Sequence, residues 1–402
     1  MSIVLAFSGG LDTSYCVPYL AETYGEPIIT VTVNTGGIAP DEEAALEARA
    51  LELGAERHFT LDARLDLFND HLSYLIKGNV LRGGVYPLCV GPERVVQARH
   101  LARAARELGA RAVAHGSTGA GNDQVRFDVA IRILAGDLEV LAPIRELGLS
   151  REASAAYLTD RGFHASAEKA AYSINKGLWG TTIGGQETLS PNAPLPESAY
   201  PDTVPPAKAP DDALSIEITF DKGIPTHLDG RRMDPVALIE TLNAVGAKHG
   251  VGRGMHVGDT ILGIKGRVGF EAPAPLILID AHRELEKITL TQWQRVQKDH
   301  LADFYGMMLH EGHHFDPVMR DIEAMIDSSQ QTVTGTVDVQ LFKGHIQVLG
   351  CDSPHSMFDA AVATYGETNA LWDARDARGF TRIYGVRDEL AHRAHTPSNS
   401  KV

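Results

Sequence analysis

The sequence is short of cysteine and of long hydrophobic runs, and each shortage excludes a class of protein. Only three of its 402 residues are cysteines, Cys16, Cys89 and Cys351, and no two of them have Cys-x-x-Cys spacing. This odd, scattered set excludes a disulfide framework and a cysteine zinc site and indicates a reducing compartment. No apolar run is long enough to span a membrane, and the N-terminus lacks the basic region and apolar stretch of a signal peptide. We therefore expect a cytoplasmic protein without a membrane partner.

Positive charge is also in deficit. Lys and Arg number 37 against 52 Asp and Glu, which gives a net charge of −15 and argues against a nucleic-acid partner. The hydrophobic content of 44% and the charged content of 22% are those of a soluble globular protein. The length is sufficient for two domains with separate cores, and the composition favours work on small metabolites.

A glycine pair near the N-terminus carries the first chemical signature. The apolar run Ile3–Phe7 predicts a buried strand, and Gly9 and Gly10 allow a sharp turn after it. Pro18 lacks an amide donor and is tolerated only near a first helical turn, so we expect the next helix to begin close to Ser14. Backbone amides at such a helix start face an anion, which predicts a phosphate site.

Three known phosphate-binding sequence patterns are candidates for this loop. No Lys follows the second glycine, which excludes a Walker A loop, and the glycines are adjacent rather than spaced, which excludes the dinucleotide fingerprint. The third pattern, Ser-Gly-Gly-x-Asp-Thr-Ser over residues 8–14, resembles the pyrophosphate loop of ATP-cleaving ligases. A glycine-rich turn after an edge strand is the alternative on these residues alone.

Strand and helix patterns alternate through the first 165 residues. We expect strands over 27–34 and 112–115 and helices over 41–53 and 95–108. Such alternation predicts an α/β fold, with a doubly wound parallel-sheet nucleotide-binding domain over residues 1–165. Ligands gather at the carboxyl ends of such strands, so we expect the segments 8–14, 33–37 and 116–123 to share one crevice.

The second half has a different organisation. Seven prolines within residues 191–210 predict a long extended connection. Beyond it we expect a strand over 214–220, hairpin turns at 229–230 and 343–344, a helix from 234 to 246 and a terminal helix over 387–395. We assign an α+β synthetase domain to residues 166–365 and a C-terminal helical tail to 366–402. The tail either reaches a neighbouring subunit or is a frayed surface helix.

A second polar signature follows the expected strand at 112–115. Residues 115–127 read His-Gly-Ser-Thr-Gly-Ala-Gly-Asn-Asp-Gln-Val-Arg-Phe, so backbone flexibility is combined with a hydroxyl, an amide, a carboxylate and a guanidinium. A solvated loop is the alternative. With this segment the chain resembles the argininosuccinate synthase family, and the resemblance covers nearly its whole length. Supporting segments are Ala142–Arg145, Tyr172–Asn175, His249–Arg253, Phe270–Pro273 and Ala281–Arg283.

The resemblance implies an ATP-driven condensation of citrulline with aspartate in arginine biosynthesis. In that reaction the ureido oxygen attacks the α-phosphorus, pyrophosphate leaves, and the aspartate amine displaces AMP from citrullyl-AMP. The resemblance also implies Mg²⁺ bound with ATP, no further metal centre and a homotetramer. The alternatives are an adenylating ligase for a different ureido acceptor, such as an N-acylated citrulline, and a non-catalytic nucleotide-binding regulator.

By the same resemblance, individual residues take roles. The ATP-binding positions are Ala6, Phe7, Ser8, Gly9, Gly10, Leu11, Asp12, Thr13, Ser14, Val33 and Gly116. The aspartate-binding positions are Thr118, Asn122 and Asp123, and the citrulline-binding positions are Tyr86, Asn122, Arg126, Ser173 and Thr182. We expect Asp12 and Arg126 to be catalytic, Asp12 by orienting Mg²⁺ or hydroxyls and Arg126 as a fork for a substrate carboxylate.

The chain departs from the family pattern at four positions. Gly91 and Thr182 each replace a usual Ser, Gly258 replaces a Glu that binds citrulline, and Phe270 replaces a Tyr. Thr182 keeps the hydroxyl, whereas Gly258 and Phe270 remove two polar contacts to the acceptor. We expect Asp259 to replace the lost carboxylate; otherwise an acceptor with a blocked amine should serve as well as citrulline.

One motif points elsewhere. His310-Glu311-Gly312-His313-His314 satisfies the His-Glu-x-x-His pattern of zinc proteases, which requires a continuous helix. Gly312 and the following Asp316-Pro317 predict that the helix ends there, so we reject a metalloprotease and expect a surface histidine cluster.

Overall fold

The structure is a computed structural model that describes residues 1–119, 121–165, 171–359 and 371–396. Its chain divides into two compact units, residues 1–355 and 356–402. The domain boundaries expected at 165/166 and 365/366 fall at segments outside the described residues. No helix in the described ranges is both long enough and apolar enough to cross a bilayer.

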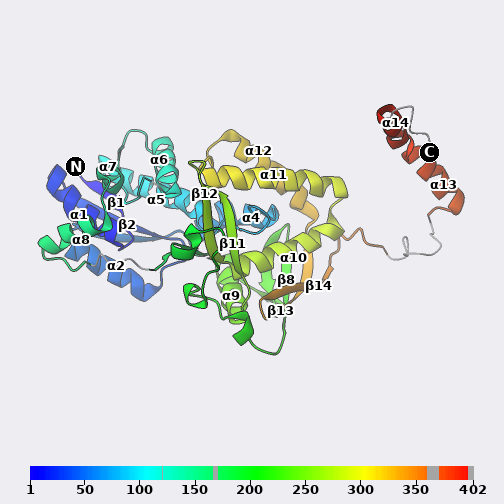
Figure 1. The fold of residues 1–402 in the computed structure, drawn as a ribbon, viewed down its shortest axis with the longest axis horizontal. Coiled ribbons are helices and arrows are strands. Elements are labelled where there is room, and N and C mark those ends of the chain that lie inside the picture. Colours follow the sequence, from blue (N-terminus) through cyan, green and yellow to red (C-terminus); the bar gives the residue numbers. More distant parts are fainter. Residues whose placement is uncertain (120, 166–170, 360–370, 397–402) are drawn as a thin grey trace. The chain divides into compact units, whose positions relative to one another are not determined.

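The first unit opens with a five-stranded parallel sheet in the order β3-β2-β1-β4-β5. Branched apolar residues alternate across it: Ile3 and Leu5 of β1 belong to one buried core, and Val4 belongs to another. Helices α1, α2 and α8 cover the first face, and α5 and α6 cover the second (Figure 1). The strands are β1 (Ile3–Ala6), β2 (Ile28–Asn34), β3 (Arg57–Asp62), β4 (Ala112–Ala114) and β5 (Glu139–Leu141).

This arrangement confirms the doubly wound sheet. The strand order reverses between β1 and β4, and β2, β1 and β4 are neighbours, so the loops after them leave the same edge together. The covering helices are α1 (Leu11–Tyr24), α2 (Pro40–Glu52), α5 (Gly91–Glu107), α6 (Asn122–Leu134), α7 (Pro143–Leu147) and α8 (Arg151–Asp160).

The expected start of the first helix was wrong. Helix α1 begins at Leu11 with Gly10 as its N-cap, and Pro18 lies inside it. A proline in a helix interior costs about 3 kcal/mol because it removes a hydrogen bond and crowds the preceding turn. Burial of Val17 and Leu20 against the sheet offsets that cost. The first-turn amides therefore lie immediately after the glycine pair.

The rest of this unit contains two antiparallel sheets with helices packed on them, as expected for an α+β second half. One has the order β11-β12-β7-β6, and the other β10-β9-β8-β13-β14. Their strands are β6 (Ser173–Gly177), β7 (Gly180–Gly184), β8 (Leu214–Asp221), β9 (Ile224–Leu228), β10 (Arg231–Arg232), β11 (Arg253–Asp259), β12 (Lys265–Glu271), β13 (Gly335–Phe342) and β14 (His345–Asp352).

Helices pack on these sheets and complete the unit. The hairpins at 229–230 and 343–344 are confirmed, and Asp234 caps α9 as expected by accepting from the Val236 amide at 2.9 Å. The proline-rich connection contains only the short 3₁₀ turns Glu197–Ala199 and Pro206–Lys208. The remaining helical segments are α3 (Arg64–Leu67), the π-helical turn Phe68–Leu72, α4 (Ser73–Lys77), α9 (Pro235–Lys248), α10 (Pro273–Thr289), α11 (Gln292–Glu311) and α12 (Pro317–Ser329).

The second unit is helical where it is described. It contains α13 (Ala374–Tyr384) and α14 (Val386–His395), so a helix at 387–395 is confirmed. Asp373 caps α13 by accepting from the amides of Arg375 and Asp376. The fold class, a parallel-sheet domain followed by antiparallel sheets and a helical tail, is thus as the sequence predicted.

Candidate active site

Hydrogen bonds made by its own hydroxyl groups fix the conformation of the loop between β1 and α1. The Ser8 amide donates to Thr13 Oγ1 at 3.3 Å, Thr13 Oγ1 donates to the Gly10 carbonyl at 3.2 Å, and Ser14 Oγ donates to the Gly9 carbonyl at 3.4 Å. Gly9 has a φ of +71°, which side-chain-bearing residues rarely adopt. Gly10 caps α1 without a side-chain hydrogen bond, so the amides of the first turn remain available to an anion.

The loop after β4 packs directly on this helix start. A Cβ added to Gly116 would lie 2.9 Å from Thr13 Cγ2 and 3.2 Å from the Thr13 amide nitrogen. Only glycine permits that approach, so the two loops share one side of the sheet edge. Asp12 lies beside this contact, half-buried. Burial raises the Asp12 pKa, and Arg151 opposes the rise, so a bound cation would favour its ionised form.

The loop after β2 closes the other side. Val33 is buried near the end of β2, and Phe7 is tied to the same strand by its amide, which donates to the Val31 carbonyl at 3.0 Å. A Cβ on Gly36 would lie 2.6 Å from Leu178 Cβ, so this loop packs on the turn between β6 and β7. The three expected segments therefore adjoin one edge of the sheet.

A buried cationic pair holds Asp123 at the start of α6. Its carboxylate accepts from Arg94 Nε at 2.9 Å and from Arg126 Nη1 at 3.0 Å. Burial alone would raise the Asp123 pKa, but Arg94 and Arg126 bring it below its usual range. Asp123 is still one-third exposed, so an incoming ammonium can reach it. Arg94, which also contacts Asn175 Oδ1 at 3.2 Å, was not singled out from the sequence.

Most of the Arg126 fork is occupied. Its Nε and Nη2 donate to the His310 carbonyl at 3.0 and 2.7 Å, and Nη2 also lies 3.2 Å from His310 Nδ1. The side chain is 4% exposed, and burial lowers its pKa. In this structure Arg126 thus orients Asp123 and the end of α11, and offers few free donors to a substrate carboxylate.

Two of the three histidines, His310 and His314, are buried, contrary to expectation, whereas His313 is exposed. Helix α11 ends at Glu311 and Gly312 adopts a φ of +88°, so His310 and His314, the two histidines of the pattern, do not share a helix face. His310 and His314 are each 7% exposed, because His310 packs on Arg126 and His314 on His71. No group of three potential metal ligands occurs among the described residues.

Glu93 is a second buried group that the sequence did not reveal. It is 2% exposed at the first turn of α5, next to Arg94. Burial raises its pKa to about 8, with Arg94 and Thr35 opposing the rise. Its Oε1 has no hydrogen-bond partner among the described residues. A carboxyl that is largely protonated near neutral pH therefore adjoins the Arg94–Asp123 pair.

The expected acceptor positions lie along the four-stranded sheet. Thr182 of β7 is opposite Phe270 of β12, so both side chains share a face. The Phe270 ring is 5.4 Å from Tyr86, which stacks on His256 at 5.5 Å. Ser173 begins β6, in the same sheet and exposed to solvent. The rings of Phe270, Tyr86 and His256 thus pack together as an aromatic layer, the acceptor floor, with the Thr182 hydroxyl beside it.

Asn122 and Thr118 lie on the neighbouring loop. Asn122 Oδ1 accepts from the Ile261 amide at 2.9 Å, which ties the start of α6 to the turn between β11 and β12. Thr118 is exposed four residues earlier. The loop with the predicted aspartate positions is thus in direct contact with the four-stranded sheet on which Thr182 and Ser173 lie.

Asp259 does not enter this site. Its Oδ1 lies 2.6 Å from Lys265 Nζ, and its side chain is more than half exposed. Gly258 is the previous residue on the same strand, and adjacent strand residues face opposite sides. A Cβ on Gly258 would lie 2.5 Å from His256 Nε2 and 3.1 Å from Arg82 Nη1. Basic groups, rather than the expected carboxylate, therefore surround position 258.

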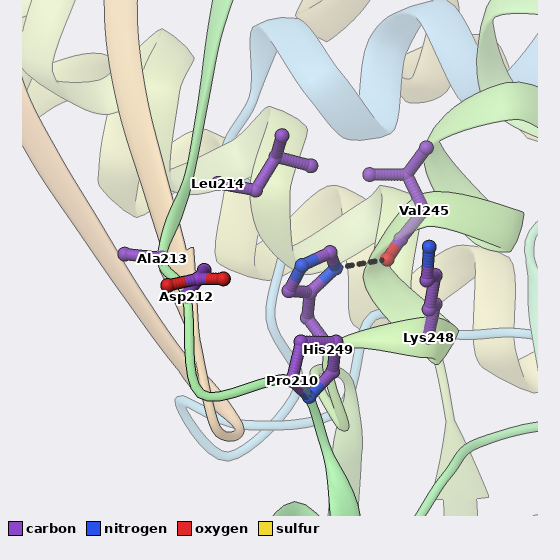
Figure 2. Close-up of a pocket in the computed structure, with 7 residues that line it drawn as sticks. All are labelled: Pro210, Asp212, Ala213, Leu214, Val245, Lys248 and His249. Atoms are coloured by element: carbon purple, nitrogen blue, oxygen red, sulfur yellow. Dashed lines mark hydrogen bonds between the residues drawn. The ribbon is translucent and has the colours of Figure 1, made fainter.

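A separate cavity is unrelated to these residues. Pro210, Asp212, Leu214, Val245, Lys248 and His249 line it, and Figure 2 shows the His249 ring bonded to the Val245 carbonyl, 2.9 Å away. It lies at the C-terminal end of α9 and contains none of the residues predicted to bind ATP, aspartate or citrulline.

Comparison with known proteins decides the family. The N-terminal HUP domain of argininosuccinate synthases matches residues 2–164, and the C-terminal domain matches 172–391. The chain belongs to the argininosuccinate synthase family. The argininosuccinate synthase of Methanocaldococcus jannaschii is 38% identical over 96% of this chain and 97% of its own. Those of Synechococcus sp. strain JA-3-3Ab and Xanthomonas campestris are each 40% identical, over 99% and 96% of this chain and 98% and 97% of theirs.

As a member of the argininosuccinate synthase family, the chain is a ligase, and its differences from the family pattern can be located in the structure. The nucleotide loop keeps the whole Ser-Gly-Gly-x-Asp-Thr-Ser pattern, whereas Gly91, Gly258 and Phe270 all gather near the acceptor floor. Gly91 lies against Arg126, because a Cβ there would be 3.6 Å from Nη2. The expected departures thus lie at or near positions predicted to bind the acceptor, and the predicted nucleotide loop contains none of them.

Proposed function

We propose that this protein uses ATP to condense a ureido acid with aspartate, in the manner of argininosuccinate synthases, with citrulline as the family's acceptor and arginine biosynthesis as the setting. The observation that carries the proposal is the position of two segments at the point where the strand order reverses. The β1–α1 loop follows β1, the segment that leads to the Asp123 network follows the adjacent strand β4, and the two segments are in contact. A phosphate site and a site for an amino acid then face one crevice.

The chemistry proceeds in two displacements. The ureido oxygen attacks the α-phosphorus of ATP, a carbon–oxygen–phosphorus link forms, and pyrophosphate leaves toward the loop of residues 8–14. The first-turn amides of α1 and the hydroxyl of Ser8 stabilise the charge that develops on the leaving group. The aspartate amine then attacks the activated ureido carbon, and the original ureido oxygen departs with AMP.

Asp123 supports the second displacement. Its carboxylate, fixed by Arg94 and Arg126, accepts a hydrogen bond from the aspartate ammonium and holds it until the amine is deprotonated. Asn122 sets the distance between α6 and the acceptor sheet through its bond to the Ile261 amide.

Mg²⁺ fits the nucleotide side of the crevice. Mg²⁺ binds through one or two carboxylates together with substrate phosphates and water, and Asp12 offers one half-buried carboxylate beside the loop. The ion would neutralise the charge on the phosphates as the leaving group departs. The role of Asp12 is to hold and orient it.

A heavy-oxygen label tests the reaction order. Citrulline, or another ureido acid that proves active, is labelled at the ureido oxygen and incubated with ATP, Mg²⁺ and aspartate. We expect pyrophosphate release that depends on the ureido acid, and the label in the phosphate of AMP. Nucleotide binding without turnover of any ureido acid would favour a regulator, and label in the condensed product would contradict the adenylate.

The proposal includes a homotetramer. Phe380, Ile383 and Tyr384 of the second unit are 62%, 76% and 73% exposed, and an apolar stripe of this kind on a helix fits a protein partner. Sedimentation measurements on the whole chain and on a Phe380→Asp, Ile383→Asp variant test it, with a smaller assembly expected for the variant. A monomer in both would contradict this part of the proposal.

A further inference from the structure

The acceptor end of the crevice contains an unusual concentration of basic groups. Arg82, His256 and His310 approach one another around Gly258, and Arg126 contacts His310 from the other side. Among the described residues, no carboxylate lies within ion-pair distance of the Arg82 guanidinium. The carboxylate of Asp123 pairs with two arginines and that of Asp259 pairs with Lys265, while Arg82 acts on Asp259 from beyond ion-pair distance.

One of these groups lacks a partner. His256 and His310 are each 7% exposed, and His256 Nε2 is buried with no hydrogen bond among the described residues, whereas the His310 ring interacts with the Asp259 backbone. Buried nitrogen atoms of this kind carry a free-energy penalty until something bonds to them. His310 Nδ1 accepts from Arg126, so the proton of its neutral ring is on Nε2, which makes that atom a donor.

Arg82 adds a further donor on the same side. Its Nη2 donates to the Asp259 carbonyl at 2.6 Å, while Nη1 faces the space that a Cβ of residue 258 would occupy, 3.1 Å away. His256 Nε2 faces that space from 2.5 Å. Glycine at 258 therefore leaves a guanidinium nitrogen and an imidazole nitrogen uncovered by any side chain.

An ammonium is a poor ligand for this place. It carries three donors and no acceptor, and it would lie beside a guanidinium that forms no ion pair among the described residues. An amide carbonyl or a carboxylate can accept from Arg82 Nη1 and from an imidazole N–H. The acceptor floor of Tyr86 and Phe270 extends beneath the same groups and suits an uncharged substituent.

We infer that the acceptor is a ureido acid without a cationic amine, carrying instead a hydrogen-bond-accepting group that faces Arg82 and His256. This inference rests on the proposed function, because it names the substrate class of the same crevice. It differs from the expectation that Asp259 preserves an ammonium site, since that carboxylate is paired with Lys265 on the opposite face of β11.

A panel of acceptors tests it with the whole wild-type chain. Citrulline, desaminocitrulline, N-formylcitrulline and N-acetylcitrulline are compared by pyrophosphate release with ATP, Mg²⁺ and saturating aspartate. We expect kcat/KM for desaminocitrulline to exceed that for citrulline by about tenfold, and the formyl or acetyl derivative to be better still. Desaminocitrulline is smaller than citrulline, so its result is free of steric exclusion.

A matched pair of variants locates the cause. Arg82→Met removes the free guanidinium, and Lys265→Met removes a cation from the far face of the same hairpin. Arg82→Met should reduce the preference for amine-free acids by about tenfold with the ATP requirement unchanged, and Lys265→Met should leave the preference as in wild type. Thermal unfolding of both variants checks that they are folded.

The outcomes separate the two proposals. Citrulline turned over as well as or better than desaminocitrulline by the wild-type protein would overturn this inference and leave the proposed function standing. No pyrophosphate release with any ureido acid would overturn both. Equal effects of the two substitutions would move the preference away from Arg82.

Discussion

Asp123→Asn separates the structural task of this carboxylate from the substrate-binding task proposed for it. The side chain bridges Arg94 and Arg126, and an Asn can accept from only one of them while directing its amide hydrogens at the other. A hydrogen bond to a charged group contributes about 1.5–3 kcal/mol. Asp123 is one-third exposed, which reduces this, so we expect a loss of roughly 1–2 kcal/mol in the free energy of unfolding.

The stability change should depend on pH in a defined direction. The Asp123 pKa is lowered in the folded state, so its contribution is fully present above the unfolded pKa of about 3.9 and is lost as pH falls through the folded pKa. The difference between wild type and Asp123→Asn should therefore be constant near neutral pH and disappear in acid. Denaturant unfolding over that range measures it.

The catalytic effect should be specific to aspartate. Loss of the contact to the substrate ammonium should raise the aspartate KM by about tenfold or more, with the ATP KM almost unchanged. Asp128→Asn is the control, since Asp128 also lies on α6 and bridges two groups, His115 at 2.9 Å and Arg145 at 2.9 Å. An equal rise in the aspartate KM in both variants, or no rise in either, would refute the assignment of Asp123 to the amine donor.

Two further predictions follow from single positions. Gly9→Ala should lower both stability and ATP use, because φ of +71° costs a side-chain-bearing residue about 1–2 kcal/mol and the new Cβ would lie 2.5 Å from Leu46 Cδ2. Gly10 has φ of −71°, so Gly10→Ala should keep the wild-type unfolding temperature and raise only the ATP KM. Equal unfolding temperatures for the two variants would contradict this. The pKa of Glu93 in the folded state is raised to about 8, so its contribution to wild-type stability is fully present below the unfolded pKa and is lost as pH rises to the folded pKa. Gln stays uncharged, so Glu93→Gln should stabilise the protein relative to wild type more at pH about 9 than at pH about 5. Thermal unfolding at both pH values checks it, and an unchanged difference would show that Glu93 is not protonated in the native state.

The sheet and its loops were predictable because their signals are local. A branched run followed by a glycine pair specifies a strand and a turn within about ten residues, and three such junctions predicted neighbouring strands. The start of α1 was misjudged because the cost of Pro18 is local, whereas the burial that offsets it comes from the packed sheet. Helix α5 likewise begins at Gly91, four residues before its predicted start, and thereby brings Glu93 and Arg94 into its first turn.

The site was less predictable because its contacts join distant parts of the chain. Arg126 and His310 are 184 residues apart, and nothing near either one in the sequence indicates the other. The histidine cluster appeared solvated for the same reason, since charge and polarity were all that its own segment showed. Asp259 is a different case: strand alternation predicts that it faces away from Gly258, so the sequence contained that information once β11 was recognised.

The charge distribution relates these findings to substrate choice. The chain carries a net charge of −15, yet Arg82, Arg94 and Arg126 surround the crevice with Asp123 as their main internal counter-ion. Such a crevice in an acidic protein concentrates the local potential and attracts anions while the remaining surface repels them. ATP and aspartate are both anionic at neutral pH, and an acceptor without an ammonium carries one more unit of negative charge than citrulline. The same field therefore favours all three proposed substrates, and raising the salt concentration should weaken the amine-free acceptor's advantage over citrulline if that advantage is electrostatic.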